Sequence, residues 1–288
     1  MKKKISTSSY DFIVNNITFS FSNAMSFSQC PYGWKLNYID RLSKVDNFFS
    51  DYGLLIHDLL ERFWAGELGL WDLPLEYEKL FEERVVSPIP AMLGRHNIWQ
   101  GYKDAGLKFF EDLKWNLDEW EIIGNETTID CEYDGYKLTI RPDLIYKNKE
   151  SGLVYLVDYK SKKPPLTKKG NVSQAQIKDY KKQLSLYAYF VEKEMGIKID
   201  CLRIIYTRGY YEVDIPYTKE IVQETLDWWS STIEEIMKNE EFIPCDTKKE
   251  HFFCSTLCGV REHCQYWDRP KPQSIPAAPD DYMPPIPF

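Results

Sequence analysis

The chain has 288 residues and a formal net charge of −8 at pH 7, with 43% hydrophobic and 28% charged residues. Its length suits one large domain or two small ones, and its composition is that of a globular protein. The negative charge argues against an extended basic surface for duplex DNA, although a local basic groove is compatible with it.

The sequence predicts no membrane segment and an intracellular, cytoplasmic location. No run of 18 apolar residues occurs, so no transmembrane helix is expected. The initial MKKK lacks the apolar stretch that follows in a secretory signal. In a reducing compartment, the seven cysteines are expected to be free thiols or metal ligands rather than disulfides.

The first part of the chain is predicted to be a tail followed by helices. Residues 1–20 are expected to form a flexible tail. Within residues 22–42, Ser26 or Ser28 is expected to cap a helix. Cys30 in this segment is either a small buried side chain or a ligand.

Residues 52–66 are predicted to form an amphipathic helix. His57 and Glu61 are four residues apart and therefore share a face outside the apolar stripe. Helical spacing recurs twice in residues 70–120, on either side of the loop SPIPAMLGRHN. The apolar stripe of the first helix consists of Leu55, Ile56, Leu59, Leu60, Phe63 and Trp64.

A β-hairpin is predicted over residues 136–160, where apolar and polar residues alternate in two arms. A strand over residues 126–133 is expected to precede it. If the turn has four residues, 149–152, then Tyr146 pairs with Tyr155. That register determines which polar side chains meet across the hairpin.

In this register Asp143 falls directly opposite Asp158. Two carboxylates that face each other across a sheet repel. A divalent cation such as Mg²⁺ prefers carboxylate oxygens and would relieve the repulsion. Lys160 lies two residues after Asp158, so both point to one face of the strand. The hairpin therefore predicts a metal site with a lysine beside it.

Residues 161–172 are predicted to form a basic loop, and residues 173–195 a long helix. Gln183 and Tyr187 are four residues apart on one face of that helix. Two interpretations of the loop lysines are equally open: they contact phosphates, or they lie in solvent. These lysines are Lys162, Lys163, Lys168 and Lys169.

Two strands, over residues 200–207 and 210–215, and a helix over residues 218–239 complete the predicted core. From residue 126 onward the expected order is β-β-β-α-β-β-α, which is typical of an α/β fold with a mixed sheet. Residues 269–288 are rich in proline and are predicted to be disordered.

Three cysteines lie close together near the C-terminus, Cys254, Cys258 and Cys264, and Cys30 is a fourth far upstream. Four thiolates suit a [4Fe–4S] cluster or a structural zinc ion. The sequence leaves alternatives open for individual ligands, namely His251 and His263 for zinc, and Cys245 in place of Cys254 or Cys30.

The pair Pro142-Asp143 followed by Asp158-Tyr159-Lys160 resembles the PD-(D/E)XK nuclease signature. His57 before it, and Gln183 with Tyr187 after it, resemble RecB-like members of that superfamily in the same order. One cysteine before these motifs and three after them resemble the AddB, exonuclease V and CRISPR-associated exonuclease types. The sequence departs from that pattern in having three residues between Cys254 and Cys258, where the family usually has two.

The resemblance implies a restriction-endonuclease-like α/β core with a mixed sheet flanked by helices. It also implies that Asp143, Asp158 and His57 bind Mg²⁺ or Mn²⁺, with the Tyr159 backbone carbonyl as a further ligand. Lys160 would orient the attacking water. Gln183 and Tyr187 would line the active-site groove. A [4Fe–4S] cluster, or zinc as the alternative, would be bound by Cys30, Cys254, Cys258 and Cys264.

The resemblance implies a metal-dependent DNA nuclease, with an exonuclease on single-stranded DNA or DNA ends as the preferred form. Two alternatives are a nuclease subunit of a helicase or CRISPR adaptation complex, and a DNA-binding protein without catalysis that uses a zinc or iron–sulfur knuckle. No P-loop occurs in the chain, so a helicase motor would be a separate protein. The expected organisation is a tail (1–20), a helical region (21–120), the nuclease core (121–240), a cysteine segment (241–268) and a proline-rich tail (269–288).

Overall fold

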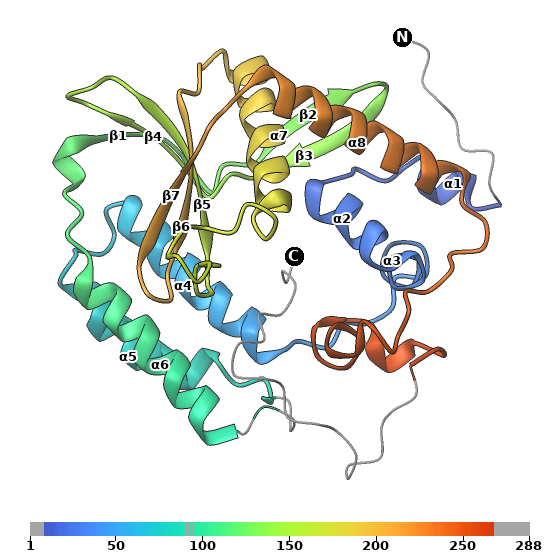
Figure 1. The fold of residues 1–288 in the computed structure, drawn as a ribbon, viewed down its shortest axis with the longest axis horizontal. Helices are drawn as coiled ribbons and strands as arrows, with labels where there is room; N and C mark the ends of the chain where they lie inside the picture. Colours follow the sequence, from blue (N-terminus) through green and yellow to red (C-terminus); the bar gives the residue numbers. More distant parts are fainter. Residues whose placement is uncertain (1–8, 90–92, 94, 268–288) are drawn as a thin grey trace.

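The computed structural model describes residues 9–89, 93 and 95–267, and its centre is a five-stranded sheet in the order β1-β4-β5-β6-β7 (Figure 1). Only β5 and β6 are parallel, and the other neighbours in this sheet are antiparallel. The predicted α/β fold with a mixed sheet is therefore confirmed. The strands are β1 (Trp120–Asn125), β4 (Leu144–Asn148), β5 (Val154–Lys160), β6 (Cys201–Tyr206) and β7 (Tyr211–Ile215), with a separate ribbon of β2 (Ile129–Tyr133) and β3 (Tyr136–Ile140).

The predicted register is confirmed for the part of the hairpin next to the turn, where β4 pairs with β5. Tyr146 pairs with Tyr155 across β4 and β5. The N–H of Asn148 donates to the carbonyl of Leu153 at 2.9 Å, so four residues form the turn, as expected.

The first arm of the hairpin is two strands rather than one, which corrects the prediction. The chain leaves the ladder after Ile140, and β3 pairs with β2 instead of the central sheet. Pro142 lies in the break, and it has no N–H to continue a ladder. The predicted order also missed β1, a short strand with an irregular register between Ile122 and Gly124.

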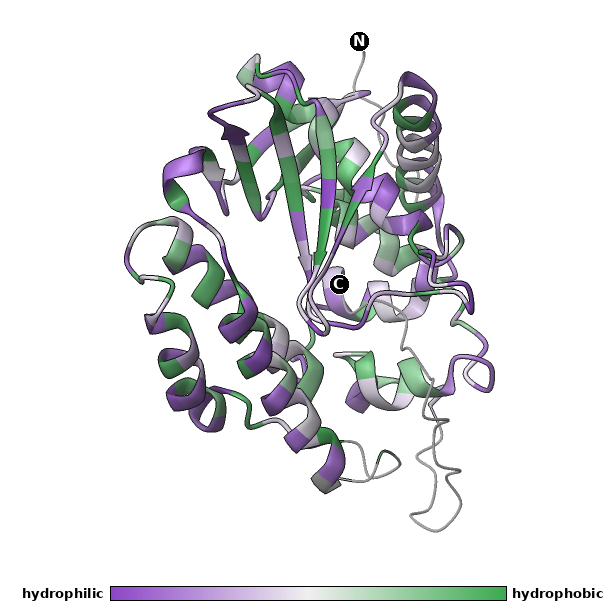
Figure 2. Ribbon diagram, turned by 60° about the vertical axis from the view of Figure 1, so that its left-hand side comes forward, coloured by the Kyte–Doolittle hydropathy of each residue, from purple (hydrophilic) through white to green (hydrophobic). Residues whose placement is uncertain are grey.

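One face of the sheet is covered by α4 (Phe48–Trp64), α5 (Asp72–Arg84) and α6 (Arg95–Asp112). The predicted apolar stripe of α4 is buried. It packs in one cluster with alternate residues of the sheet: Leu144, Tyr146, Val157, Tyr159 and Ile205. Consecutive residues of these strands, such as Leu144 and Ile145, are apolar and point to opposite faces, and Figure 2 shows long hydrophobic stretches on the strands of the central sheet. Each face can therefore bury its own set of helices.

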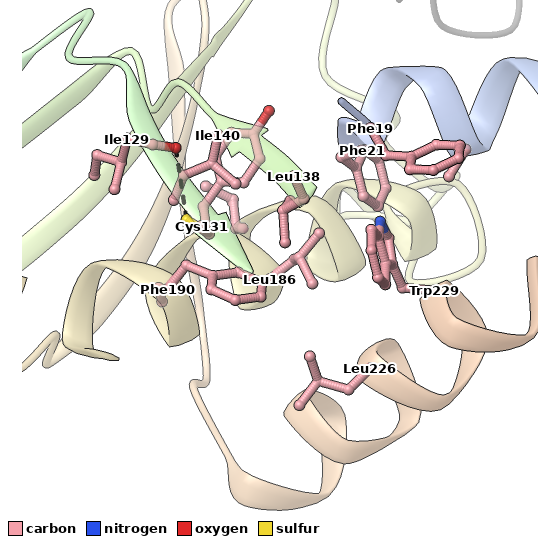
Figure 3. Packing of buried hydrophobic residues seen from close by; sticks show 14 of the residues in the cluster. Phe19, Phe21, Ile129, Cys131, Leu138, Ile140, Leu186, Phe190, Leu226 and Trp229 are labelled. Atoms are coloured by element: carbon pink, nitrogen blue, oxygen red, sulfur yellow. Dashed lines mark hydrogen bonds between the residues drawn. The ribbon is translucent and has the colours of Figure 1, made fainter. Parts of the chain in front are cut away.

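The opposite face is covered by α7 (Lys178–Met195), and α8 (Lys219–Lys238) packs beside α7. Ile145, Leu156 and Ile204 point to this side. The β2–β3 ribbon also joins this cluster, and Figure 3 shows its apolar residues facing Leu186 and Phe190 of α7. The long helix predicted from residue 173 begins at Lys178.

Residues 9–20 depart from the predicted flexible tail. They include the short helix α1 (Asp11–Val14), and Val14 and Phe19 are each 1% exposed in the core. Residues 22–42 form two helices, α2 (Phe21–Gln29) and α3 (Pro31–Tyr38). Ser20 caps α2 and Cys30 caps α3, so the predicted caps are wrong, since Ser26 and Ser28 lie inside α2.

The C-terminal cysteine segment returns to the beginning of the chain. The N–H of Val45 donates to the carbonyl of Gly259 at 2.7 Å, which places this segment between α3 and the start of α4 (Figure 1). The predicted proline-rich tail, 269–288, lies outside the described residues. Within the described part of the chain, no helix combines the length and the apolar character needed to cross a membrane.

Candidate active site

Asp143, Asp158 and Lys160 lie at one end of the central sheet. Because β4 and β5 are antiparallel, the start of β4 and the end of β5 meet there. Leu144 pairs with Val157, so Asp143 occupies the position opposite Asp158. The N–H of Tyr159 donates to Asp143 Oδ2 at 2.6 Å, which fixes this carboxylate against β5.

His57 comes from α4, which covers the face of the sheet that carries Val157 and Tyr159, and its side chain reaches the carboxylates at the sheet end. Its Nδ1 lies 3.7 Å from Asp143 Oδ2 and 3.4 Å from Glu126 Oε1. Its ring also packs edge-on against Tyr159, with the centroids 5.9 Å apart. The structure therefore brings together His57 and the acids that the sequence predicts, although they are more than 80 residues apart. Glu61, one turn further along α4, lines the same cavity.

Glu126 is a site residue that the sequence reasoning missed. Potential ligand atoms of His57, Glu126 and Asp143 all lie within 4.8 Å of one another. Glu126 directly follows β1 with a positive φ of 50°, and its N–H donates to the Asp143 carbonyl at 2.9 Å. Arg141 pairs with its second oxygen at 2.9 Å. The sequence placed Glu126 at the start of a strand, where nothing in its spacing indicates this contact.

Asp158 and Lys160 form a buried ion pair that continues onto α7. Lys160 Nζ lies 2.8 Å from Asp158 Oδ2 and donates to Gln183 Oε1 at 3.2 Å. Gln183 Nε2 donates in turn to Tyr187 Oη at 3.4 Å; Gln183 lines the cavity, and Tyr187 is joined to the site through it. Asp158 Oδ2 is buried and accepts no hydrogen bond of good geometry within the described residues. Besides the charge of Lys160, such an oxygen suits a metal cation as a second partner.

Burial and crowding of negative charge shift the acid–base properties of the site. Burial raises the pKa of Asp143 to about 7, and the nearby charges of Asp158 and Glu126 act in the same direction against His57. Burial lowers the pKa of His57, but the charges of Asp143, Glu126 and Asp158 outweigh it and raise the pKa to about 9. Protons thus offset the negative charge that a divalent cation would offset when bound.

We expect the affinity for Mn²⁺ to rise as the pH increases from about 6 to about 9. A ligating carboxylate must be ionised and a ligating imidazole neutral, so the raised pKa values of Asp143 and His57 make protons compete with the metal. Calorimetric titration in buffers of different ionisation heat would count the protons released. In His57→Gln the rise above about pH 8 should disappear. An affinity that is constant over this range would contradict the assignment of these ligands.

These residues line a cavity of about 520 Å³. The lining includes the acids Glu126, Asp143 and Asp158 and the lysines Lys160 and Lys162, and Lys160 lies directly beside Asp158. Further lining comes from α4 and α6, including Leu54, which is 71% exposed, and Tyr102. The arrangement suits a phosphate group that contacts both a bound cation and the lysine ammonium groups.

Five cysteines gather at a second place, where the C-terminal segment meets α3. They line one small enclosed space of about 10 Å³: Cys30, Cys245, Cys254, Cys258 and Cys264. The Sγ atoms of Cys245 and Cys254 are 3.6 Å apart, and the Cys245 N–H donates to Cys30 Sγ at 3.4 Å. Cys245, which the sequence treated only as a replacement, therefore lies with the four predicted ligands.

The histidines that the sequence offered as alternative zinc ligands make other contacts. A ring nitrogen of His263 lies 3.0 Å from Ser43 Oγ, and His251 packs against Trp267. Burial raises the pKa of Cys258 to about 11, with the neighbouring thiols Cys30 and Cys264 acting in the same direction. A metal that binds here would therefore displace protons from thiols. The donor set is that of a thiolate-binding group.

Comparisons with known proteins were consistent with this geometry. Residues 18–265 match the family model described as the PD-(D/E)XK nuclease superfamily. The crystal structure of a "putative exonuclease" from Eubacterium rectale aligns over 94% of this chain and 97% of that chain, with a TM-score of 0.51 and 13% sequence identity, and so shows similarity of fold alone. The crystal structure of SSO0001 covers 87% of this chain and 86% of that chain at 16% identity, but its TM-score of 0.38 supports no argument. The curated proteins include no match.

Proposed function

Because the chain belongs to the PD-(D/E)XK nuclease superfamily, we propose that it hydrolyses phosphodiester bonds of DNA with the help of Mg²⁺ or Mn²⁺. The observation that carries this proposal is the convergence of His57, Glu126, Asp143, Asp158 and Lys160 on one cavity from four separate parts of the chain.

The proposed metal ligands are Asp143, Asp158 and His57, with Glu126 added by its position and the Tyr159 carbonyl retained from the sequence. When bound, a divalent cation lowers the pKa of a water molecule and offsets charge on the phosphate. Lys160 is held between Asp158 and Gln183 and orients the water. Tyr187 holds Gln183 in place through its hydroxyl group.

We place the action on ends of single-stranded DNA, as an exonuclease. A net charge of −8 argues against an extended basic surface for a duplex, whereas Lys160 and Lys162 supply local positive charge in the cavity. The Eubacterium rectale protein described as a "putative exonuclease" has a similar fold, which is compatible with this choice.

The cysteine site is proposed to hold a [4Fe–4S] cluster through Cys30, Cys254, Cys258 and Cys264, with zinc as the alternative. The gathering of these thiols from both ends of the chain supports a structural group. Such a group would join α3 to the C-terminal segment and so stabilise the packing of both against the start of α4.

The proposed function predicts Mg²⁺- or Mn²⁺-dependent release of nucleotides from linear single-stranded DNA. Linear and circular single strands and blunt duplexes of equal length would be compared, with Lys160→Met as the inactive control. If circular single strands are cleaved as fast as linear ones, the enzyme is an endonuclease rather than an exonuclease. Binding of DNA without cleavage under all metal conditions would favour the non-catalytic alternative, and cleavage only with a helicase present would favour the subunit alternative.

A further inference from the structure

Lys162 differs from the other lysines of the loop after β5. Its Nζ lies 4.8 Å from the centroid of the Tyr180 ring, and Lys160 Nζ lies 4.5 Å from the same centroid. Both lysines line the active-site cavity. Lys163, the next residue, is exposed and lies outside that lining. The structure thus separates two neighbouring lysines that the sequence could not distinguish.

The two lysines on Tyr180 differ in how their charge is balanced. Lys160 is paired with Asp158 at 2.8 Å and bound to Gln183. For Lys162, no carboxylate within ion-pair distance and no hydrogen-bond acceptor is found among residues 9–89, 93 and 95–267. Its ammonium group instead lies over the face of the Tyr180 ring, and Asp158 attracts it only from beyond ion-pair distance.

An ammonium group in this position is costly for the protein alone. Burial lowers the pKa of Lys162 to about 8, and repulsion from Lys160 adds to the effect, while Asp158 partly opposes it. A buried cation that faces a second cation without its own counterion is stabilised by an anionic ligand. The ligand must enter the cavity that Lys162 shares with the proposed metal ligands.

We propose that Lys162 is a phosphate-binding residue, supported by the ring of Tyr180, which contacts a backbone phosphate of the substrate strand. This inference rests on the proposed function for the identity of the substrate, and it extends that function by naming a contact outside the metal site and Lys160. The phosphate supplies the directly paired counterion that Lys162 lacks among the described residues. Tyr180 is 1% exposed on α7, so it provides a rigid support for the ammonium group.

Lys162→Met tests the proposal, because methionine keeps the apolar stem on Tyr180 and removes only the charge. Binding of a single-stranded oligodeoxynucleotide would be measured by fluorescence anisotropy, with Ca²⁺ in place of Mg²⁺. We expect affinity to fall about tenfold. The slope of log affinity against log salt should decrease in magnitude by about 0.7, the value for one phosphate contact on a single strand. Lys162→Arg should restore both values.

Lys163→Met is the matched control, since it removes the adjacent, exposed charge. It should leave the salt slope unchanged, and an equal loss in both variants would overturn the proposal in favour of a general effect of loop charge. A wild-type salt slope in Lys162→Met would overturn it as well. The melting temperature of Lys162→Met without DNA should equal or exceed that of the wild type, because a destabilised charge is removed. A lower melting temperature would indicate a structural role instead.

These measurements do not depend on cleavage. If the wild type binds the oligonucleotide through Lys162 but cleaves no DNA, the proposed function is refuted and the phosphate contact stands. If the wild type cleaves DNA but Lys162→Met binds it as tightly as the wild type, the phosphate contact is refuted and the proposed function stands. A wild-type protein that fails to bind the oligonucleotide would overturn the phosphate contact.

Discussion

Replacement of Asp158 by asparagine is expected to reduce DNA cleavage by about 10³-fold. Asp158 is 3% exposed, and its two oxygens face Lys160 at 3.1 and 2.8 Å. Asparagine has the same shape and keeps one oxygen for Lys160, but it removes the charge that would hold a cation and balance the lysine. The variant therefore separates the loss of charge from the loss of packing.

Stability and binding should change much less than cleavage. Weakening a buried charged hydrogen bond lowers the free energy of unfolding by about 1–3 kcal/mol, which thermal or urea denaturation would show. DNA binding in Ca²⁺ should be retained, because one negative charge is removed from a cavity that receives phosphate. Single-turnover cleavage, which is independent of substrate release, is the decisive measurement.

Asp214→Asn is a matched control for this prediction. Asp214 lies on β7 of the same sheet and pairs with Arg203 at 2.6 Å, but its side chain is 52% exposed and it lies outside the cavity. The control should cleave DNA at the wild-type rate. Cleavage by Asp158→Asn within tenfold of the wild type would contradict the assignment of the active site.

The parts of the site that depend on local rules could be predicted from the sequence. The four-residue turn fixed the register of Tyr146 with Tyr155, and this register places Asp143 opposite Asp158. The apolar stripe of α4 determined which side of that helix packs on the sheet, and this left His57 on the side near the sheet end.

The parts that depend on distant contacts could not be predicted. Glu126 reaches Asp143 only because the β2–β3 ribbon loops out between them and packs on α7, which is a result of tertiary packing rather than of spacing. The break at Pro142 that releases the ribbon is visible only as a single residue in an otherwise regular alternation. Cys245 joins the other cysteines because its N–H meets Cys30, 215 residues earlier in the chain.

Replacement of Cys30 by serine is expected to remove the metal from the cysteine site and to lower the free energy of unfolding by several kcal/mol, about the scale of losing a structural cross-link. Cys30 is the N-cap of α3, where its Sγ accepts from the Gly33 N–H at 3.4 Å. Serine is also a good N-cap, so the helix start is kept and the loss of stability reports on the ligand. Iron, sulfide and zinc analysis after anaerobic purification, together with urea denaturation, would measure both effects.

Cys201→Ser is the control, because Cys201 lies on β6, outside the cysteine site. It should keep the full metal content. Equal metal content and stability in Cys30→Ser and the wild type would refute a metal centre that joins the two ends of the chain.

Cys245→Ser then identifies the ligand set. If Cys30, Cys254, Cys258 and Cys264 are the four ligands, this variant keeps its metal, and we expect about four irons per chain. A zinc ion bound at about 2.3 Å by tetrahedral thiolates would hold sulfur atoms about 3.8 Å apart, which is close to the 3.6 Å between Cys245 and Cys254. Loss of one zinc per chain in Cys245→Ser, with retention in Cys264→Ser, would therefore reassign both the metal and one of its ligands.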